Sequence, residues 1–375
     1  MRPLSPGWHM LAVVCPRCQQ QLRIRPEHAS RRVQCPSCRE ILTVQATLPP
    51  PPPSGVATSR DSPVSAGPGH IPASGGPGAT AFPFLGSPQA PGELGVLGGY
   101  RVVRLLGAGG MGCVFEAVDP NLGRRVALKV LNADTAAHPQ GRQRFLREAR
   151  TAAALQHEHV VAIHHVGEDN GVPFLVMPLL QGETLEKRLA LTGPFPVPVA
   201  VRIGREIAEA LSAAHRKGLI HRHVKPANVW LQTPGWRVKL LDFGLARPAE
   251  GGRTRLTRLG QAVGTPSYLA PEQIAGEAEP RSDLFSLGCV LYEMVTGRRP
   301  FDGIHVEANL ACVAAVTPPA PAVLVPDVPQ ALSDLIMALL AKRPADRPAN
   351  AEVVAHRLRA LQAPQWRSWP SRSSG

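Results

Sequence analysis

Four cysteines near the amino terminus fall in two copies of one short pattern. Cys15 and Cys18 form one C-x2-C pair, Cys35 and Cys38 form the other, and sixteen residues separate the two pairs. Two thiolates three positions apart can bind one metal ion, and two such pairs supply the sulfur ligands of a closed tetrahedral zinc site. Disulfide pairing is the alternative, which the lack of a secretory context disfavours. The spacing therefore predicts a structural zinc site.

The segment that holds these cysteines, residues 15–45, contains apolar residues that indicate hairpin strands. They are Leu22 and Ile24, then Val33, then the group from Ile41 to Val44. So short a segment cannot bury a core of its own, so the metal would supply much of its stability. The segment resembles the small zinc ribbons found at the amino termini of many bacterial proteins.

A glycine-rich stretch indicates a second kind of chemistry, phosphate binding. It has the spacing G-x-G-x-x-G-x-V and lies between two expected strands. A dinucleotide-binding fingerprint would open a helix after its third glycine, but the residues here continue with the alternation of a strand. A strand-loop-strand with accessible backbone amides can cover a triphosphate. The residues of this glycine loop are Leu106, Gly107, Ala108, Gly109, Gly110, Met111, Gly112, Cys113 and Val114.

A lysine follows the glycine loop at a distance that suits the same chemistry. Lys129 lies fifteen residues beyond Val114 in a strand-like run, and it is one of only six lysines in the chain. From a strand beside the loop it could reach phosphate oxygens as a point charge. With the loop and this lysine, the sequence resembles the eukaryotic-type protein kinases, specifically the serine/threonine kinases of bacteria. The resemblance covers residues 100 to about 361.

The resemblance implies roles for further residues, in the order of the family's motifs. Glu148 stands where the family places the glutamate that pairs with Lys129. A hinge that binds adenine follows, and proline at one of its positions keeps the carbonyl that the family uses there. The hinge residues are Met177, which is similar to the gatekeeper, Pro178 and Leu180.

The catalytic loop and the metal ligands come next in this order. Lys225 and Asn228 are similar to the family's catalytic-loop lysine and metal-binding asparagine, and Asp242 opens the Asp-Phe-Gly motif whose aspartate binds magnesium. Carboxylate and amide oxygens are the hard ligands that Mg²⁺ prefers. Phosphoryl transfer builds charge on the γ-phosphoryl oxygens, which Lys129 and Lys225 would stabilise. The resemblance therefore implies ATP and Mg²⁺ as cofactors and protein serine or threonine as substrate.

Later motifs are similar to the elements that support the family's catalytic loop. Glu272 ends the Ala-Pro-Glu motif that closes the activation segment, and Arg347 matches the arginine that pairs with this glutamate. Asp283 matches the aspartate of a buried helix that braces the catalytic loop, and Arg222 matches the residue that receives an activation-segment phosphate. The candidate phosphorylation sites are Thr254, Thr257, Thr265 and Ser267.

One position departs from the family's pattern. The catalytic loop should read His-Arg-Asp, but here His223 replaces the aspartate that orients the substrate hydroxyl and accepts its proton. A neutral imidazole can accept a proton, but it brings no negative charge. Loss of a positioned general base slows such reactions by about 10² to 10⁴. Two interpretations remain open: a serine/threonine kinase with weakened activity in signalling, and a nucleotide-binding pseudokinase that acts as a regulatory scaffold.

The elements that must position these residues follow from the order of periodic segments. Strands come first and helices afterwards, which predicts an α+β fold with two lobes. Residues 46–99 hold twelve prolines and eleven glycines, which predicts a disordered linker. The expected organisation is a tail at 1–14, a zinc ribbon at 15–45, the linker at 46–99, a kinase domain at 100–361 with a β-rich lobe at about 100–177 and a helical lobe at about 181–361, and a disordered tail at 362–375.

The composition limits the remaining classes of function. The formal net charge is +13, but no run of five or six like charges concentrates it, so nucleic-acid binding is not favoured. A zinc ribbon that binds nucleic acid beside a regulatory kinase-like domain is a third hypothesis. No apolar run reaches the length of a membrane span, and the start lacks the apolar length of a secretory signal, so we expect a cytoplasmic protein. The sequence leaves open whether two copies associate and phosphorylate each other.

Overall fold

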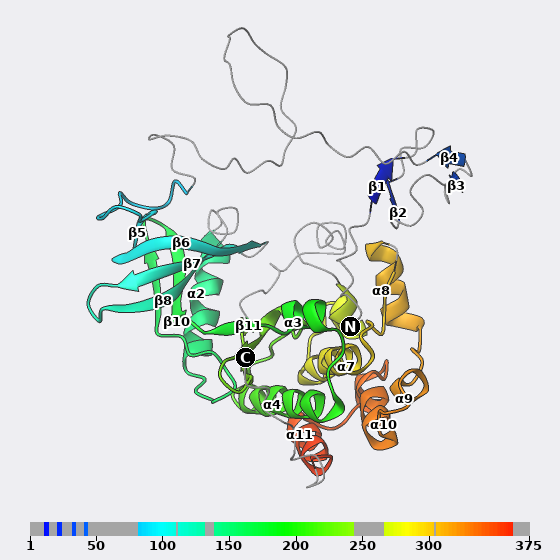
Figure 1. Cartoon of the computed structure of the whole chain (residues 1–375). Coiled ribbons are helices and arrows are strands. Elements are labelled where there is room, and N and C mark those ends of the chain that lie inside the picture. Colours follow the sequence, from blue (N-terminus) through cyan, green and yellow to red (C-terminus); the bar gives the residue numbers. More distant parts are fainter. Residues whose placement is uncertain are drawn as a thin grey trace, which may run out of the picture. The chain divides into compact units, whose positions relative to one another are not determined.

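The computed structural model describes the main folded part of the chain and four short strands before it (Figure 1). The described residues are 11–14, 21–24, 32–34, 41–43, 82–109, 112–131, 139–243, 266–303 and 305–362. The chain divides into two compact units, Met1–Gly76 and Pro77–Gly375.

The amino-terminal unit contains two pairs of antiparallel strands. β1 (Leu11–Val14) pairs with β2 (Gln21–Ile24), and β3 (Arg32–Gln34) pairs with β4 (Ile41–Thr43). Strands β2, β3 and β4 cover most of the apolar residues that predict a hairpin module. The four cysteines of the zinc prediction lie outside the described residues. The zinc site therefore stays a prediction.

A six-stranded antiparallel sheet forms one lobe of the second unit (Figure 1). Its strands are hydrogen-bonded in the order β5-β6-β7-β8-β10-β9, and helix α2 (Pro139–Ala153) packs against β9 and β10. The strands are β5 (Gly95–Leu97), β6 (Tyr100–Gly109), β7 (Gly112–Asp119), β8 (Arg124–Leu131), β9 (His165–Asp169) and β10 (Val172–Pro178). This is the β-rich lobe that the resemblance predicts.

Strand β8 is buried on both faces from Val126 to Leu131. Successive side chains of a strand point to opposite faces, so this strand contributes to two apolar layers. Val126, Leu128 and Val130 pack in one cluster with β7 and β10, whereas Leu131 packs with residues of α2. Ala127 and Lys129 share the face of Leu131. The alternation of the strand therefore places Lys129 on the face opposite to Val126, Leu128 and Val130.

The sheet begins earlier in the chain than the sequence predicts. The sequence predicts a linker up to residue 99, but residues 82–99 pack against the sheet and include β5, which pairs with β6, so the linker prediction is wrong for this part. Phe82 packs edge-to-face on Phe115 with ring centroids 4.9 Å apart, and Leu97 is fully buried. Gly98 has a φ of 59°, and a Cβ there would lie 2.2 Å from the ring of Phe174. The high proline and glycine content favours a linker, although the segment also contains the apolar residues that pack on the sheet.

The helical lobe is built around helix α7 (Pro280–Thr296), whose residues from Ser282 to Tyr292 are all buried. Helix α4 (Val197–His215) packs against α7 and also against α11 (Ala351–Ala360), and α10 (Gln330–Leu339) covers another side of α7 (Figure 1). A helix that is apolar on all sides belongs in a core. Helix α7 therefore provides the fixed frame on which the loops of this lobe are mounted.

Shorter elements complete the helical lobe. A small antiparallel sheet has the order β11-β12-β13; β11 precedes the catalytic loop in sequence, and β12 and β13 follow it. The remaining elements are β11 (Gly182–Thr184), β12 (Val229–Gln232), β13 (Arg237–Leu240), α3 (Leu185–Thr192), α6 (Pro271–Ile274), α8 (Val306–Ala315), α9 (Pro321–Leu324) and the 3-10 turns η2 (Pro226–Asn228), η4 (Pro266–Tyr268) and η5 (Pro344–Asp346).

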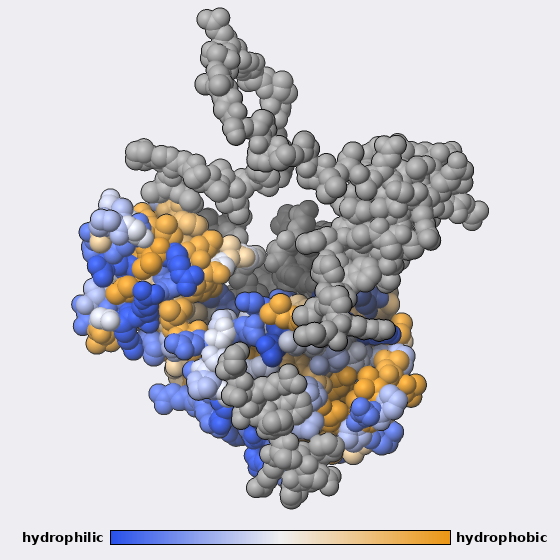
Figure 2. Space-filling model, in the orientation of Figure 1, coloured by the Kyte–Doolittle hydropathy of each residue, from blue (hydrophilic) through white to orange (hydrophobic). Residues whose placement is uncertain are grey.

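The face of the described part that Figure 2 shows is mixed in hydropathy. Large apolar side chains that remain exposed occur in both lobes, for example Leu122 in the sheet lobe and Val323 in α9. Within the described residues, no helix combines the length and the apolar character needed to cross a bilayer.

Candidate active site

The glycine loop lies between β6 and β7, as the sequence predicts. Backbone pairing continues to its tip, where Gly109 is opposite Gly112, and residues 110 and 111 lie outside the described part. A Cβ added at Gly107 or at Gly109 would meet no atom within 4 Å. The loop therefore presents bare backbone that a phosphate group can approach, the function for which glycine is suited.

An apolar cluster beneath this loop draws residues from both lobes. Ala127, Val161 and Met177 are buried together, and four half-buried residues pack on them. The backbone pairing of β8 with β10 sets Met177 opposite Ala127 and Pro178 opposite Val126. Such a mostly apolar lining suits a flat, weakly polar ring such as adenine. The four half-buried members are Val114, Leu179, Leu180 and Leu241.

A lysine and an aspartate from different lobes form an ion pair next to this cluster. The Nζ of Lys129 lies 2.6 Å from Oδ1 of Asp242, with side-chain exposures of 7% and 23%. Burial alone would raise the pKa of Asp242, but the adjacent Lys129 ammonium lowers this pKa overall, so the carboxylate is ionised. Asp242 has a φ of 61°, a strained conformation that is typical of functional sites. Helix α2 carries the predicted partner Glu148, which is half-buried, and its pairing with Lys129 stays a prediction.

The catalytic loop is held by the carboxylate of Asp283, as the resemblance predicts. Asp283 is fully buried in α7, and its two oxygens accept hydrogen bonds from the backbone N–H groups of His221, at 2.8 Å, and Arg222, at 2.7 Å. The imidazole of His215 also lies 2.8 Å from Asp283. A carboxylate with this many donors is a rigid anchor. It fixes a backbone turn in which Arg222 has a φ of 68°.

The buried imidazole of His221 has a defined tautomer. Burial lowers the pKa of His221, which favours the neutral ring. Its Nδ1 accepts a hydrogen bond from the backbone N–H of His223, so its Nε2 carries the proton and donates to the carbonyl of Leu241 at 2.7 Å. The ring also packs on Phe243 at 4.6 Å between centroids. His221 therefore joins the catalytic loop to the segment after β13 that carries Asp242.

The residues predicted to hold magnesium have suitable donor atoms. The side-chain Nδ2 of Asn228 donates to the backbone carbonyl of His223 at 2.8 Å, which fixes the amide so that its oxygen faces away from that carbonyl. The backbone carbonyl of Asn228 accepts from Leu241, the residue before Asp242. An oriented amide oxygen and an ionised carboxylate on adjoining segments fit a hard divalent cation.

The end of the activation segment is anchored by the predicted pair Glu272–Arg347. Two nitrogens of Arg347 donate to the two oxygens of Glu272 at 2.6 and 2.9 Å, and Ser282 donates to the same carboxylate at 2.6 Å. The phosphorylation site suggested at Ser267 is not supported, because this side chain is fully buried and accepts a hydrogen bond from Asn309. The three candidate threonines lie outside the described residues.

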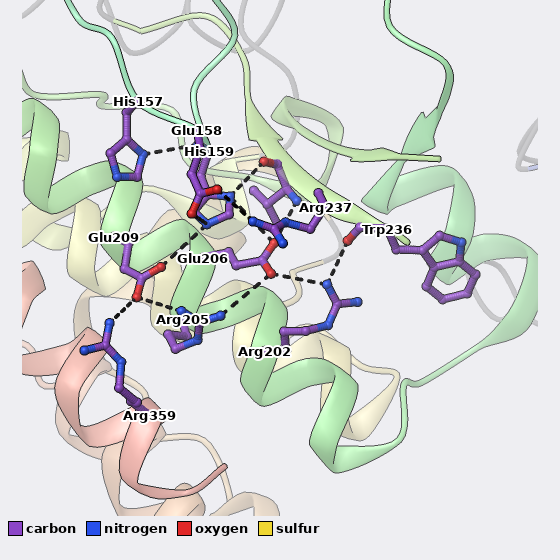
Figure 3. A network of polar contacts seen from close by, with 11 residues as sticks. His157, Glu158, His159, Arg202, Arg205, Glu206, Glu209, Trp236, Arg237 and Arg359 are labelled. Carbon is purple, nitrogen blue, oxygen red and sulfur yellow. Dashed lines mark hydrogen bonds and ion pairs between the residues drawn. The ribbon is translucent and has the colours of Figure 1, made fainter. Parts of the chain in front are cut away.

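A charged network that the sequence did not reveal joins α4 to residues 157–159 and to α11 (Figure 3). Glu206 and Glu209 project from α4 toward His159, which belongs to the segment that also supplies Val161 to the cluster. Glu206 is buried, and it accepts from the backbone N–H of Val238 at 2.8 Å. A glutamate on the buried face of an amphipathic helix was the available signal. The arginines of the network are Arg202, Arg205, Arg237 and Arg359.

Comparison with known proteins identifies the family to which this site belongs. A protein kinase domain model matches residues 100–358. The serine/threonine-protein kinase PknA of Mycobacterium tuberculosis (strain ATCC 25177 / H37Ra) is 42% identical over 272 residues, which are 71% of this chain and 62% of PknA. The probable serine/threonine-protein kinase PknB of Corynebacterium glutamicum is 38% identical over 271 residues, which are 68% of this chain and 41% of PknB. The chain thus spans less than two thirds of the length of these relatives.

Solved structures show the same fold. The crystal structure of the PknI kinase domain of Mycobacterium tuberculosis superposes with a TM-score of 0.58 at 32% identity and covers 72% of this chain and 98% of that one. The region that the family model matches, residues 100–358, contains the glycine loop, the Lys129–Asp242 pair and the catalytic loop braced by Asp283. On these grounds, the chain belongs to the protein kinase domain family.

Proposed function

We propose that the chain is an ATP-dependent protein kinase that transfers the γ-phosphoryl group to serine and threonine hydroxyls of proteins in cytoplasmic signalling. The observation that carries this proposal is the Lys129–Asp242 pair at 2.6 Å, assembled from two lobes next to the glycine loop and the catalytic loop. Such a juxtaposition requires β8 and the end of β13 to be positioned together. A scaffold that had no use for Mg-ATP would have no need of it.

The residues of the site divide the work of the reaction. The glycine-loop amides and Lys129 would bind and orient the phosphates, and the apolar cluster would bind the adenine. A magnesium ion held by Asp242 and Asn228 supplies neutralisation of phosphate charge when it is bound. Lys225 would add fixed positive charge close to the developing negative charge. Correct positioning of charge supplies most of the catalysis in this reaction class.

His223 occupies the catalytic-base position in this proposal. Its backbone is fixed by the contacts to His221 and Asn228 described above. Its imidazole, when neutral, would accept the proton of the substrate hydroxyl. This proton transfer would be less efficient than with aspartate, because the imidazole brings no negative charge. The alternative, a nucleotide-binding pseudokinase that acts as a regulatory scaffold, differs only in the rate of transfer.

A comparison of wild type, His223→Asp and Asp242→Ala separates these two functions. We measure Mg-ATP binding and transfer of radiolabelled phosphate to a generic protein substrate and to the chain itself. Transfer by the wild type above the Asp242→Ala background supports the kinase. Binding without transfer, with transfer restored in His223→Asp, would establish the pseudokinase instead. His356→Asp, which makes the same change at an exposed position of α11, is the matched control.

We also propose that the amino-terminal unit is a zinc ribbon with Cys15, Cys18, Cys35 and Cys38 as ligands. The strands support this, because one cysteine pair lies between β1 and β2 in sequence and the other between β3 and β4. We expect about one zinc ion per purified chain by elemental analysis. Cys18→Ser combined with Cys38→Ser should remove it, whereas Cys312→Ser should not. Equal zinc in all three proteins would contradict the proposal.

A further inference from the structure

The peptide group between Arg222 and His223 is held at both of its polar atoms. Its N–H, which belongs to His223, donates to Nδ1 of His221 at 3.2 Å. Its carbonyl, which belongs to Arg222, accepts from Nε2 of Gln273 at 2.9 Å. The preceding N–H of Arg222 is bound by Asp283. Because Arg222 has a φ of 68°, which a side chain disfavours, these bonds are needed to maintain the turn.

The side chain of Gln273 has a single chemically sensible orientation. Its Oε1 accepts a hydrogen bond from the backbone N–H of Ala270 at 3.0 Å, so its amide nitrogen must face the carbonyl of Arg222. Both ends of the amide are therefore used. A carboxylate at this position could keep the first bond, but it would place a second oxygen against the carbonyl of Arg222.

Gln273 is carried by a short helix that cannot move freely. Its neighbour Glu272 is bound by two nitrogens of Arg347 and by the hydroxyl of Ser282. Helix α6 is thus anchored to the frame of the helical lobe through one residue, and it reaches the catalytic loop through the next. Glu272 is the last residue of the Ala-Pro-Glu motif that closes the activation segment, and Gln273 follows it directly.

We propose that Gln273 is a positioning residue for the reaction: by holding the carbonyl of Arg222, it orients the peptide group that leads into His223 and so aligns the catalytic-base position with the end of the activation segment. The inference rests on the proposed function in one respect, that the residue at position 223 faces the reacting hydroxyl. Gln273 acts through backbone and touches neither nucleotide nor substrate in this scheme.

The test compares Gln273→Met and Gln273→Glu in the full chain, each in the wild type and in the His223→Asp background. Methionine keeps the length of the side chain without a donor, and glutamate keeps the acceptor alone. We expect kcat to fall about tenfold in both, because both lose the hydrogen bond to the carbonyl of Arg222, with the KM for ATP and the ATP dissociation constant within about twofold. Gln330→Met, which removes an exposed side-chain bond to Asp334, is the control and should change nothing.

Amide hydrogen exchange supplies a readout that does not depend on activity. We expect the amides of residues 221–223 to exchange faster in both Gln273 variants and not in Gln330→Met. Unchanged kcat, or a fall in rate that disappears once corrected for the folded fraction, would overturn the proposal. If only the His223→Asp proteins transfer phosphate, the proposed activity of the wild type is contradicted. The effect of Gln273 on kcat is then measured by comparing the His223→Asp proteins with and without the Gln273 substitution. If none transfers phosphate, unchanged exchange overturns the positioning role and faster exchange supports it.

Discussion

Two ion pairs of the second unit share one distance, 2.6 Å from nitrogen to oxygen, and differ in how their members are held. Arg347 and Glu272 lie in the helical lobe, and the arginine side chain is fully buried. Lys129 and Asp242 come from different lobes, and the aspartate side chain remains 23% exposed. The first pair is the more fully buried of the two, since the Glu272 side chain is 11% exposed, whereas Lys129 of the second pair lies opposite Val114 of the glycine loop.

The difference lies in the remaining bonds of each cation. Besides Glu272, Arg347 donates to three backbone carbonyls, so that all five of its N–H groups have acceptors. A planar guanidinium fixed in this way cannot change partners without breaking several bonds. Lys129 bears a compact charge that can be shared between a carboxylate and a phosphate. Saturation of the donors, not the distance, thus separates the structural ion pair from the pair for which we propose a catalytic role.

The largest expected effect comes from Asp242→Asn. The amide keeps the shape of the side chain and can still accept from Lys129, so the free energy of unfolding should change by less than about 1 kcal/mol. Phosphoryl transfer should fall roughly 10³-fold, because a charged group at the reacting phosphates is lost. Radiolabel transfer and urea unfolding on the same preparations measure both. A rate within tenfold of the parent protein would break the comparison.

The second effect is the reverse, a loss of stability with little loss of rate. Arg347→Met leaves the half-buried Glu272 without its main partner and should lower the free energy of unfolding by about 3 kcal/mol. Transfer per folded molecule should stay within about threefold of the parent, because Ser282 still binds Glu272 and so holds helix α6 in place. Arg359→Met is the control, because that side chain is 64% exposed and its pair with Glu209 should contribute less than about 1 kcal/mol. Equal losses in the two variants would show that closure of the pair is unimportant.

A third effect depends on pH. Burial alone would raise the pKa of Glu272, but the bonds from Arg347 and Ser282 lower this pKa overall. A carboxyl with a lowered folded pKa stabilises the protein above its unfolded pKa, and this contribution is lost as the pH falls. Glu272→Gln should therefore cost about 2 kcal/mol near pH 7 and progressively less from about pH 5 to pH 3. Urea midpoints across this range measure the difference, and a gap that does not depend on pH would contradict it.

Much of the site could be predicted because its residues sit in short motifs with fixed local spacing. The glycine loop and Lys129 lie on adjacent strands, and the braces Asp283 and Arg347 have the partners that the resemblance implies. Gln273 carries no such signal. Its partner Arg222 is 51 residues away, and a four-residue helix has no periodicity that could mark one side chain.

The errors have a common physical origin, which is that local composition does not report burial. Residues 82–99 are rich in proline and glycine, yet Phe82 and Leu97 pack against the sheet because strand β6 offers β5 a pairing edge. Ser267 belongs to a segment that looks like an accessible loop, but η4 packs against α7 and α8 and buries its hydroxyl. Both outcomes depend on contacts between segments distant in sequence.

The smallest expected effect sharpens the comparison within the closed pair itself. Ser282→Ala removes a neutral donor from the charged carboxylate of Glu272 and an acceptor from the backbone N–H of Glu279, and it leaves the two bonds from Arg347 in place. The free energy of unfolding should fall by about 1 kcal/mol, with no change in transfer. Ser333 is equally buried and, like Ser282, accepts from a backbone N–H, that of Ala322, so Ser333→Ala should cost about half as much and isolates the bond to the carboxylate. Both substitutions remove one buried hydroxyl that accepts from a backbone N–H, and only Ser282 also donates to Glu272. An equal loss of unfolding free energy would therefore mean that the bond from Ser282 to the charged carboxylate adds nothing, and that the stability of the pair comes from the guanidinium of Arg347 alone.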